Sequence, residues 1–173
     1  LKNTGSERLP IRSVQMTVLG ANGNTLHQEN YVSYMPSVVE PGETMLVSEW
    51  MYDFVKEIGK VHSIRISVET ASRAYEKWKQ LGDVRAWLDG DYLCVEFTNT
   101  TEKTLFGVIC AATVSDANGQ ILDMMMQSPY DTDDLGIAQG SSIVWRKQLE
   151  DAATLKIGAD AVCKAWAYWM EDL

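Results

Sequence analysis

Apolar and polar residues alternate over most of this chain, and a period of two is the spacing of β-strands. In "LCVEFT" (93–98) the apolar Leu93, Val95 and Phe97 lie on one predicted face, and "SSIVWRKQL" (141–149) repeats this spacing. The pattern therefore predicts an all-β fold with at most short helical segments.

Two stretches depart from this alternation. "WMYDFVKEI" (50–58) places several apolar residues on one helical face and is the best candidate for a short helix. "ETASRAYEKWKQLGD" (69–83) follows the alternating segment "SIRISV" (63–68). We expect this stretch to run from the end of a strand into a short connector.

Nearly the same turn occurs twice, as "GANGNTL" (20–26) and "DANGQIL" (116–122). In both copies Asn is followed by Gly, and these residues tolerate the positive φ that a type I′ turn requires at its two central positions. Each copy is therefore predicted to be a β-hairpin with such a turn.

The similarity extends well beyond the turn. Aligned without gaps, residues 1–26 and 97–122 share nine identities in 26 positions. The alternation is kept as well, because small or apolar residues fall on the same predicted face in both copies. The aligned positions of that face are Val14, Met16 and Val18 in the first copy and Cys110, Ala112 and Val114 in the second. We therefore predict two tandem β-sandwich domains, residues 1–81 and residues 82–173.

The first copy is predicted to lack its first strand. In the second copy "VRAWLDGDYLCVE" (84–96) precedes Phe97, whereas the residue that aligns with Phe97 is Leu1. The equivalent strand is expected to lie upstream, to be disordered, or to be supplied by another chain, because natural sandwiches usually cover an exposed edge.

Both copies contain an apolar-x-Asn-Thr motif, then Leu, an alternating strand and an "A-N-G" turn, and the first continues to a "P-G" turn in "VEPGE" (39–43). This pattern resembles the bacterial immunoglobulin-like repeats of the FxLYD type, which occur in tandem on envelope lipoproteins and secreted proteins. Where that family has Tyr-Asp before the turn, this chain has "LGANG" and "VSDANG". The resemblance implies immunoglobulin-like sandwiches outside a Gram-positive cell, with no catalytic residues to transfer.

Composition excludes several classes of partner. The chain of 173 residues is 46% hydrophobic and 23% charged, with a formal net charge of -9. That sign opposes nucleic acid and anionic lipid surfaces. No apolar run approaches the ~20 residues that span a bilayer, so no membrane insertion is expected. The opening "LKNTGSERLP" lacks an initiator Met and is interpreted as a mature or trimmed fragment.

Motifs for enzymatic, redox or metal chemistry are not found. Cys94, Cys110 and Cys163 form an odd set without C-x-x-C spacing. Cys110 is predicted to be a small buried hydrophobe, with a Cys94–Cys110 disulfide as an alternative if the protein is extracellular. The acidic loop "YDTDDLG" (130–136) lacks the spacing of a calcium loop and is predicted to be solvated. We expect no enzyme activity, cofactor, metal site or catalytic residue.

Large apolar side chains occur in the second copy where the first copy is polar. "DMMMQ" (123–127) aligns with "HQENY" (27–31), and alternation sends Met124 and Met126 to the face opposite Met125. The last strand, "CKAWAYWMED" (163–172), similarly carries two aromatic residues on the face opposite its small residues. The candidate interaction surface is Met124, Met126, Trp166 and Tyr168.

The sequence therefore predicts a non-enzymatic spacer or protein-interaction module of the cell envelope or of a secreted protein, with an unidentified protein partner. The alternative is a module that binds a glycan or another small ligand, because exposed planar aromatic side chains stack on sugar rings.

Overall fold

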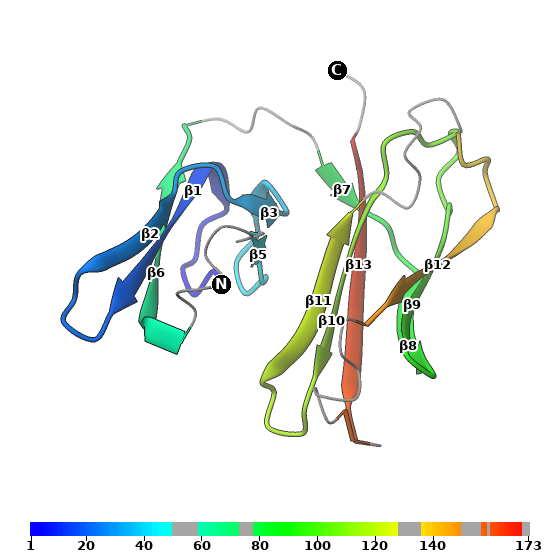
Figure 1. Cartoon of the computed structure of the whole chain (residues 1–173). Coiled ribbons are helices and arrows are strands. Elements are labelled where there is room, and N and C mark those ends of the chain that lie inside the picture. Colours follow the sequence, from blue (N-terminus) through cyan, green and yellow to red (C-terminus); the bar gives the residue numbers. More distant parts are fainter. Residues whose placement is uncertain (50–58, 73–77, 128–135, 150–156, 159, 171–173) are drawn as a thin grey trace. The chain divides into compact units, whose positions relative to one another are not determined.

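The computed structural model describes residues 1–49, 59–72, 78–127, 136–149, 157–158 and 160–170. The elements of these residues are the strands β1 to β13 (Figure 1), which confirms the predicted all-β fold class. The short helix predicted over 50–58 lies outside the described residues, and so does the acidic loop apart from Gly136.

The chain divides into two compact units, Leu1–Glu76 (unit 1) and Lys77–Leu173 (unit 2). The strands of unit 1 are β1 (Leu9–Gly20), β2 (Thr25–Glu29), β3 (Ser33–Met35), β4 (Val38–Val39), β5 (Leu46–Ser48) and β6 (Val61–Thr70). Those of unit 2 are β7 (Trp78–Gln80), β8 (Val84–Asp89), β9 (Tyr92–Thr98), β10 (Ile109–Ser115), β11 (Ile121–Gln127), β12 (Ser142–Gln148) and β13 (Val162–Met170).

Unit 2 is sandwich-like. Its strands form two antiparallel sheets, with the orders β11-β10-β13-β7 and β12-β9-β8. In unit 1, β1 pairs with β2, β4 and β6, while β3 pairs with β5. Because alternate residues of a strand point to opposite faces, each central strand buries one row of apolar side chains.

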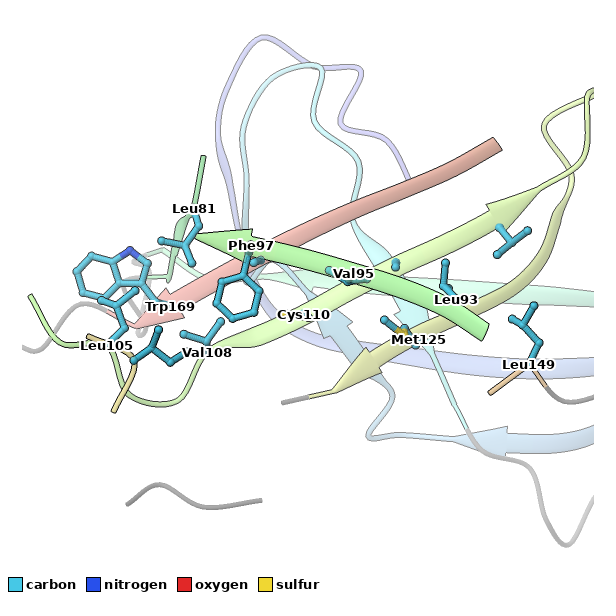
Figure 2. Close-up of a cluster of buried hydrophobic side chains, with 14 residues drawn as sticks. Leu81, Leu93, Val95, Phe97, Leu105, Val108, Cys110, Met125, Leu149 and Trp169 are labelled. Atoms are coloured by element: carbon cyan, nitrogen blue, oxygen red, sulfur yellow. The ribbon is translucent and has the colours of Figure 1, made fainter. Parts of the chain in front are cut away.

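The core of unit 2 lies between its two sheets. Leu93, Val95 and Phe97 of β9 belong to one cluster of buried side chains with Cys110 of β10 and Met125 of β11. Figure 2 shows Phe97 toward one end of this cluster, with Leu105, Val108 and Trp169, and Leu93 toward the other, with Met125 and Leu149. The face of β9 predicted from the alternation is thus the face that packs into this core.

The two hairpins have the same register. Met16 pairs with Glu29 in unit 1, and Ala112 pairs with Met125 in unit 2, so each number in unit 2 exceeds its counterpart by 96. An irregularity in the pairing also falls at equivalent places, after Val18 and after Val114. This agreement extends the sequence similarity to individual strand pairs.

The turn type predicted for these hairpins was wrong. A type I′ turn needs positive φ at Asn118 as well as Gly119, but among the described residues only Asp83 has positive φ outside glycine. Instead, Gly119 N donates to Asp116 O (3.0 Å), Asp116 N donates to Gln120 O (2.9 Å), and Gly119 has a φ of 82°. This is the longer loop in which a left-handed Gly forms a bulge after the turn.

We expect Gly119→Ala to destabilise unit 2 by about 1 kcal/mol, because a β-carbon disfavours the left-handed backbone. The space around Gly119 is open, so no clash adds to this cost. Urea denaturation of the variant measures the change. Ala117→Gly in the same loop is the control and should lack this backbone strain; an equal or larger loss there would contradict the explanation.

A buried asparagine occupies the same place in each unit. Asn99 Nδ2 donates to Lys103 O (2.8 Å) and Ile137 O (2.7 Å), while Asn99 Oδ1 accepts from Thr101 N (3.0 Å). Asn3 likewise donates to Glu7 O (2.8 Å) and Val39 O (3.0 Å) and accepts from Gly5 N (3.0 Å). In each unit the Asn of the shared motif therefore joins its own loop to a segment more than 30 residues further along the chain.

The segment expected to be a connector, 69–83, contains part of a sheet. Its first residues end β6, and Trp78–Gln80 form β7, which pairs with β13. Leu81 N then donates to Ala167 O (2.8 Å), and the Leu81 side chain is buried in the core of unit 2. Three residues are too few to show strand alternation, which is why the sequence pattern did not reveal β7.

Candidate functional site

The candidate residues come together on one face of the β11-β10-β13 sheet. Ala111 of β10 lies between Met126 of β11 and Trp166 of β13, and its neighbour on that face, Thr113, pairs with Met124. Tyr168 pairs with Ile109 at one end of the same row. We call this row the outer face of unit 2, because Met125 on the opposite face belongs to the core.

Small side chains in the central strand shape this face. Ala111 and Thr113 are buried, whereas Met124, Met126 and Trp166 remain partly exposed. Tyr168 is also buried, with 3% of its surface exposed, so it supports the face and is not an accessible contact. The accessible apolar part of the predicted surface therefore consists of Met124, Met126 and Trp166.

Unit 1 provides an internal comparison, because its sheet has the same register. The positions equivalent to Met124 and Met126 hold Gln28 and Asn30, and the position equivalent to Trp166 holds Ser67. All three are exposed in unit 1. The shared scaffold therefore does not require large apolar residues on this face.

An ion pair joins β12 to β11, which is the edge strand of this sheet. Lys147 Nζ lies 3.1 Å from Asp123 Oδ1 and also donates to Met124 O at 3.1 Å. Both side chains are largely buried, with 24% and 17% of their surface exposed. The backbone of Met124 is thus held in place while its thioether side chain stays partly exposed, which is a suitable arrangement for contacting an apolar partner surface.

The three cysteines are free thiols. Cys110 is in the core, at the register position of Val14, and burial raises its pKa to about 12. The prediction of a small buried hydrophobe at this position is confirmed. Burial, followed by the nearby Cys94, also raises the pKa of Cys163. Raised values disfavour the thiolate, so neither Cys110 nor Cys163 is set up as a nucleophile.

The burial of Cys110 predicts an alkaline loss of stability. The unfolded thiol ionises near its ordinary pKa of 9.0 and the folded one near 12, so between these values the folded state holds more protons. The stability that the buried, protonated thiol of Cys110 contributes is complete below pH 9. Above pH 9 the free energy of unfolding decreases by up to about 1.4 kcal/mol per pH unit. Urea denaturation at several pH values measures this slope. Cys110→Ala should show a shallower slope; equal slopes would contradict the prediction.

A second group of aromatic residues, not singled out from the sequence, lies on the β12-β9-β8 sheet. The guanidinium carbon of Arg85 lies 5.4 Å from the centre of the Trp87 ring, and that of Arg146 lies 4.6 Å from the Tyr92 ring. Trp87 also lines a cavity of about 390 Å³ together with Ala86, Leu88, Gly158, Ala161 and Cys163. The Arg-x-Trp spacing in β8 was the available signal, since it places both side chains on one strand face.

The described ranges contain neither a cluster of metal ligands nor a helix that could span a membrane. No three His, Cys, Asp or Glu side chains of these residues are close enough together to hold a metal ion. Nor does this part of the chain contain a helix long and apolar enough to cross a membrane.

Comparison of the chain with models of protein families, with curated proteins and with solved structures finds no match in any of the three.

Proposed function

We propose that this chain is a non-enzymatic protein-interaction module built from two immunoglobulin-like sandwich units, in which the outer face of unit 2 binds a protein partner. A location on the cell envelope or in a secreted protein rests on the resemblance of its repeated Asn-Thr and Ala-Asn-Gly motifs to FxLYD repeats. Unit 1 serves as the spacer of this module, because its face at the positions equivalent to the outer face is polar.

The observation that carries this proposal is the difference between the two units at equal register. Met124, Met126 and Trp166 take the positions that hold Gln28, Asn30 and Ser67 in unit 1. Methionine adapts to irregular partner surfaces, and tryptophan supplies a large apolar area to the centre of many interfaces. Apolar residues that the scaffold does not require are expected at a contact surface.

The test compares two double variants. The wild-type chain, immobilised, should retain a protein from an envelope extract, and the variant with Met124→Ser and Met126→Ser should not retain it. Once purified, this protein should bind the wild-type chain and not the variant. Gln28→Ser with Asn30→Ser, at the equivalent positions of unit 1, should retain the same proteins. Loss of folding in the methionine variant, with no binding difference for Trp166→Ser, would assign these residues to packing instead.

A glycan-binding function is the second candidate, supported by Trp87 and Tyr92 on the other sheet. Each ring carries an arginine guanidinium near one face. A sugar would stack on the free face of a ring or replace the arginine. Binding to a glycan array that is lost in Trp87→Ala and kept in Met126→Ser would favour this function over protein binding.

A further inference from the structure

The hairpin loop that both units share contains an asparagine followed by glycine. An asparagine in this position can react with its own backbone, because the nitrogen of the next residue attacks the side-chain carbonyl carbon and glycine has no side chain to hinder the approach. Asn22 and Asn118 precede glycine, whereas every other asparagine of the sequence precedes Thr or Tyr. Both residues are exposed. The chain therefore has two candidate sites for the same modification.

The backbones of the two loops have the same conformation. Gly23 N donates to Gly20 O (2.9 Å), as Gly119 N donates to Asp116 O (3.0 Å). The φ angles of the two following glycines also agree, at 75° for Gly23 and 82° for Gly119. The attacking nitrogen is thus held by an equivalent hydrogen bond in each loop. A difference in reactivity is therefore expected to come from the side chains around the loops.

The carboxylate of Asp116 restrains the loop of unit 2. Asp116 Oδ1 accepts from Asn118 N (2.9 Å) and Gln120 N (2.8 Å), and Asp116 Oδ2 accepts from Asn118 Nδ2 (3.4 Å). The Asn118 amide has to leave this arrangement before its carbonyl carbon can meet the nitrogen of Gly119. The negative charge of Asp116 also disfavours the oxyanion that forms on the attacked carbonyl group. Both effects slow the reaction at Asn118.

Unit 1 has no equivalent of this carboxylate. The position that corresponds to Asp116 holds Gly20, in the same register of the hairpin. Because glycine has no side-chain acceptor, none of the three bonds that Asp116 accepts has a counterpart from Gly20. Fewer hydrogen bonds have to break before Asn22 reaches the geometry of attack, so the loop of unit 1 is the more reactive of the two.

We propose that Asn22 is a site of spontaneous deamidation, and that Asp116 protects the equivalent site of unit 2. Gly23 N loses its proton to water and forms a bond to Asn22 Cγ, and the side-chain nitrogen leaves as ammonia. Water then opens the cyclic imide to give aspartate or isoaspartate, so that one water is consumed for each ammonia released. The product adds a negative charge to the loop. This loop lies in unit 1, so the inference does not depend on the proposed function.

The test follows both sites in the purified full chain, kept for several weeks in mildly alkaline buffer at body temperature. Peptide mapping by mass spectrometry measures the deamidated fraction at each site, and enzymatic methylation of isoaspartate identifies the product. Asn22 should react on the order of tenfold faster than Asn118, the factor that corresponds to one hydrogen bond to a charged acceptor. Equal rates at the two sites, or no reaction at Asn22, would overturn the proposal.

Exchanging the one residue that differs tests the role of Asp116. Asp116→Gly gives unit 2 the same Gly-Ala-Asn-Gly stretch as unit 1, so Asn118 should then react nearly as fast as Asn22, which serves as the internal standard. The reverse variant, Gly20→Asp, should slow the reaction at Asn22 and keeps the test valid if Asp116→Gly unfolds unit 2. Its added β-carbon meets Asn24 Oδ1 at 2.7 Å, the end of a side chain that can turn away. Unchanged rates in these variants, with circular dichroism showing them folded, would contradict the protection.

Two peptides separate the effect of the folded loops from that of the local sequence. They are "TVLGANGNTL" (17–26) and "TVSDANGQIL" (113–122). An isolated two-stranded hairpin is at best marginally stable in water, so the bonds to Asp116 are largely absent from the second peptide. The two peptides should therefore react at similar rates, and faster than the folded chain. A difference between them as large as that in the folded chain would assign it to sequence alone and would overturn the proposed protection by the folded loop.

Discussion

Asn99→Asp is expected to lower the free energy of unfolding of unit 2 by roughly 3–5 kcal/mol at pH 7. The Asn99 amide nitrogen donates to two backbone carbonyl oxygens, at 2.8 Å and 2.7 Å, and its side chain is fully buried. A carboxylate in its place removes both donors and turns a negative charge toward two acceptors. Such a loss is a large share of the ~5–15 kcal/mol that stabilises a typical domain.

Urea denaturation followed by tryptophan fluorescence measures this change, since five of the six tryptophans belong to unit 2. Acid should reduce the loss, because the protonated carboxyl regains one donor. Asn3→Asp is the matched control, since Asn3 makes the same contacts in unit 1 and should leave the unit 2 transition in place. A variant as stable as the wild type at pH 7 would refute the role assigned to Asn99.

Phe97→Ala is expected to destabilise unit 2 by about 3–5 kcal/mol, because it removes a large apolar side chain and leaves a cavity in the core. Phe97 is fully buried and is one of the largest side chains of the cluster in Figure 2. Calorimetry or urea denaturation of the full chain measures the loss.

The aligned residue of unit 1 provides the control for Phe97. Leu1 occupies the same register position but is 53% exposed. Leu1→Ala should therefore change stability by less than about 0.5 kcal/mol. Comparable losses in the two variants would mean that the side chain of Leu1 is covered in solution, and would contradict this prediction.

Much of the local structure was predictable because strand alternation and turn chemistry are properties of neighbouring residues. The hairpins around Gly23 and Gly119 and the buried row of Leu93, Val95 and Phe97 follow from such patterns. The turn type does not, because Asn-Gly suits both a type I′ turn and the longer loop with a Gly bulge. The register of the flanking strands decides between them.

The candidate surface was only partly predictable. Alternation places Met124 and Met126 on the face opposite Met125, as the register shows. The burial of Tyr168, by contrast, depends on neighbours from other strands and cannot be read from its own strand. The pair of Arg85 with Trp87 joins neighbours on one strand, so the sequence pattern could indicate it. The pair of Arg146 with Tyr92 joins two strands that are far apart in the sequence, so only the structure shows it.

The sequence by itself determined the strand content, the repeated hairpin and which side chains share a strand face, because these depend on the period of the chain and on the local properties of Asn and Gly. Only the tertiary structure decided what each face contacts. Asn99 reaches Ile137 O, 38 residues away, and β7 pairs with β13 near the other end of unit 2. Contacts at such separations depend on how whole sheets pack, so the same aligned position is buried at Phe97 and exposed at Leu1.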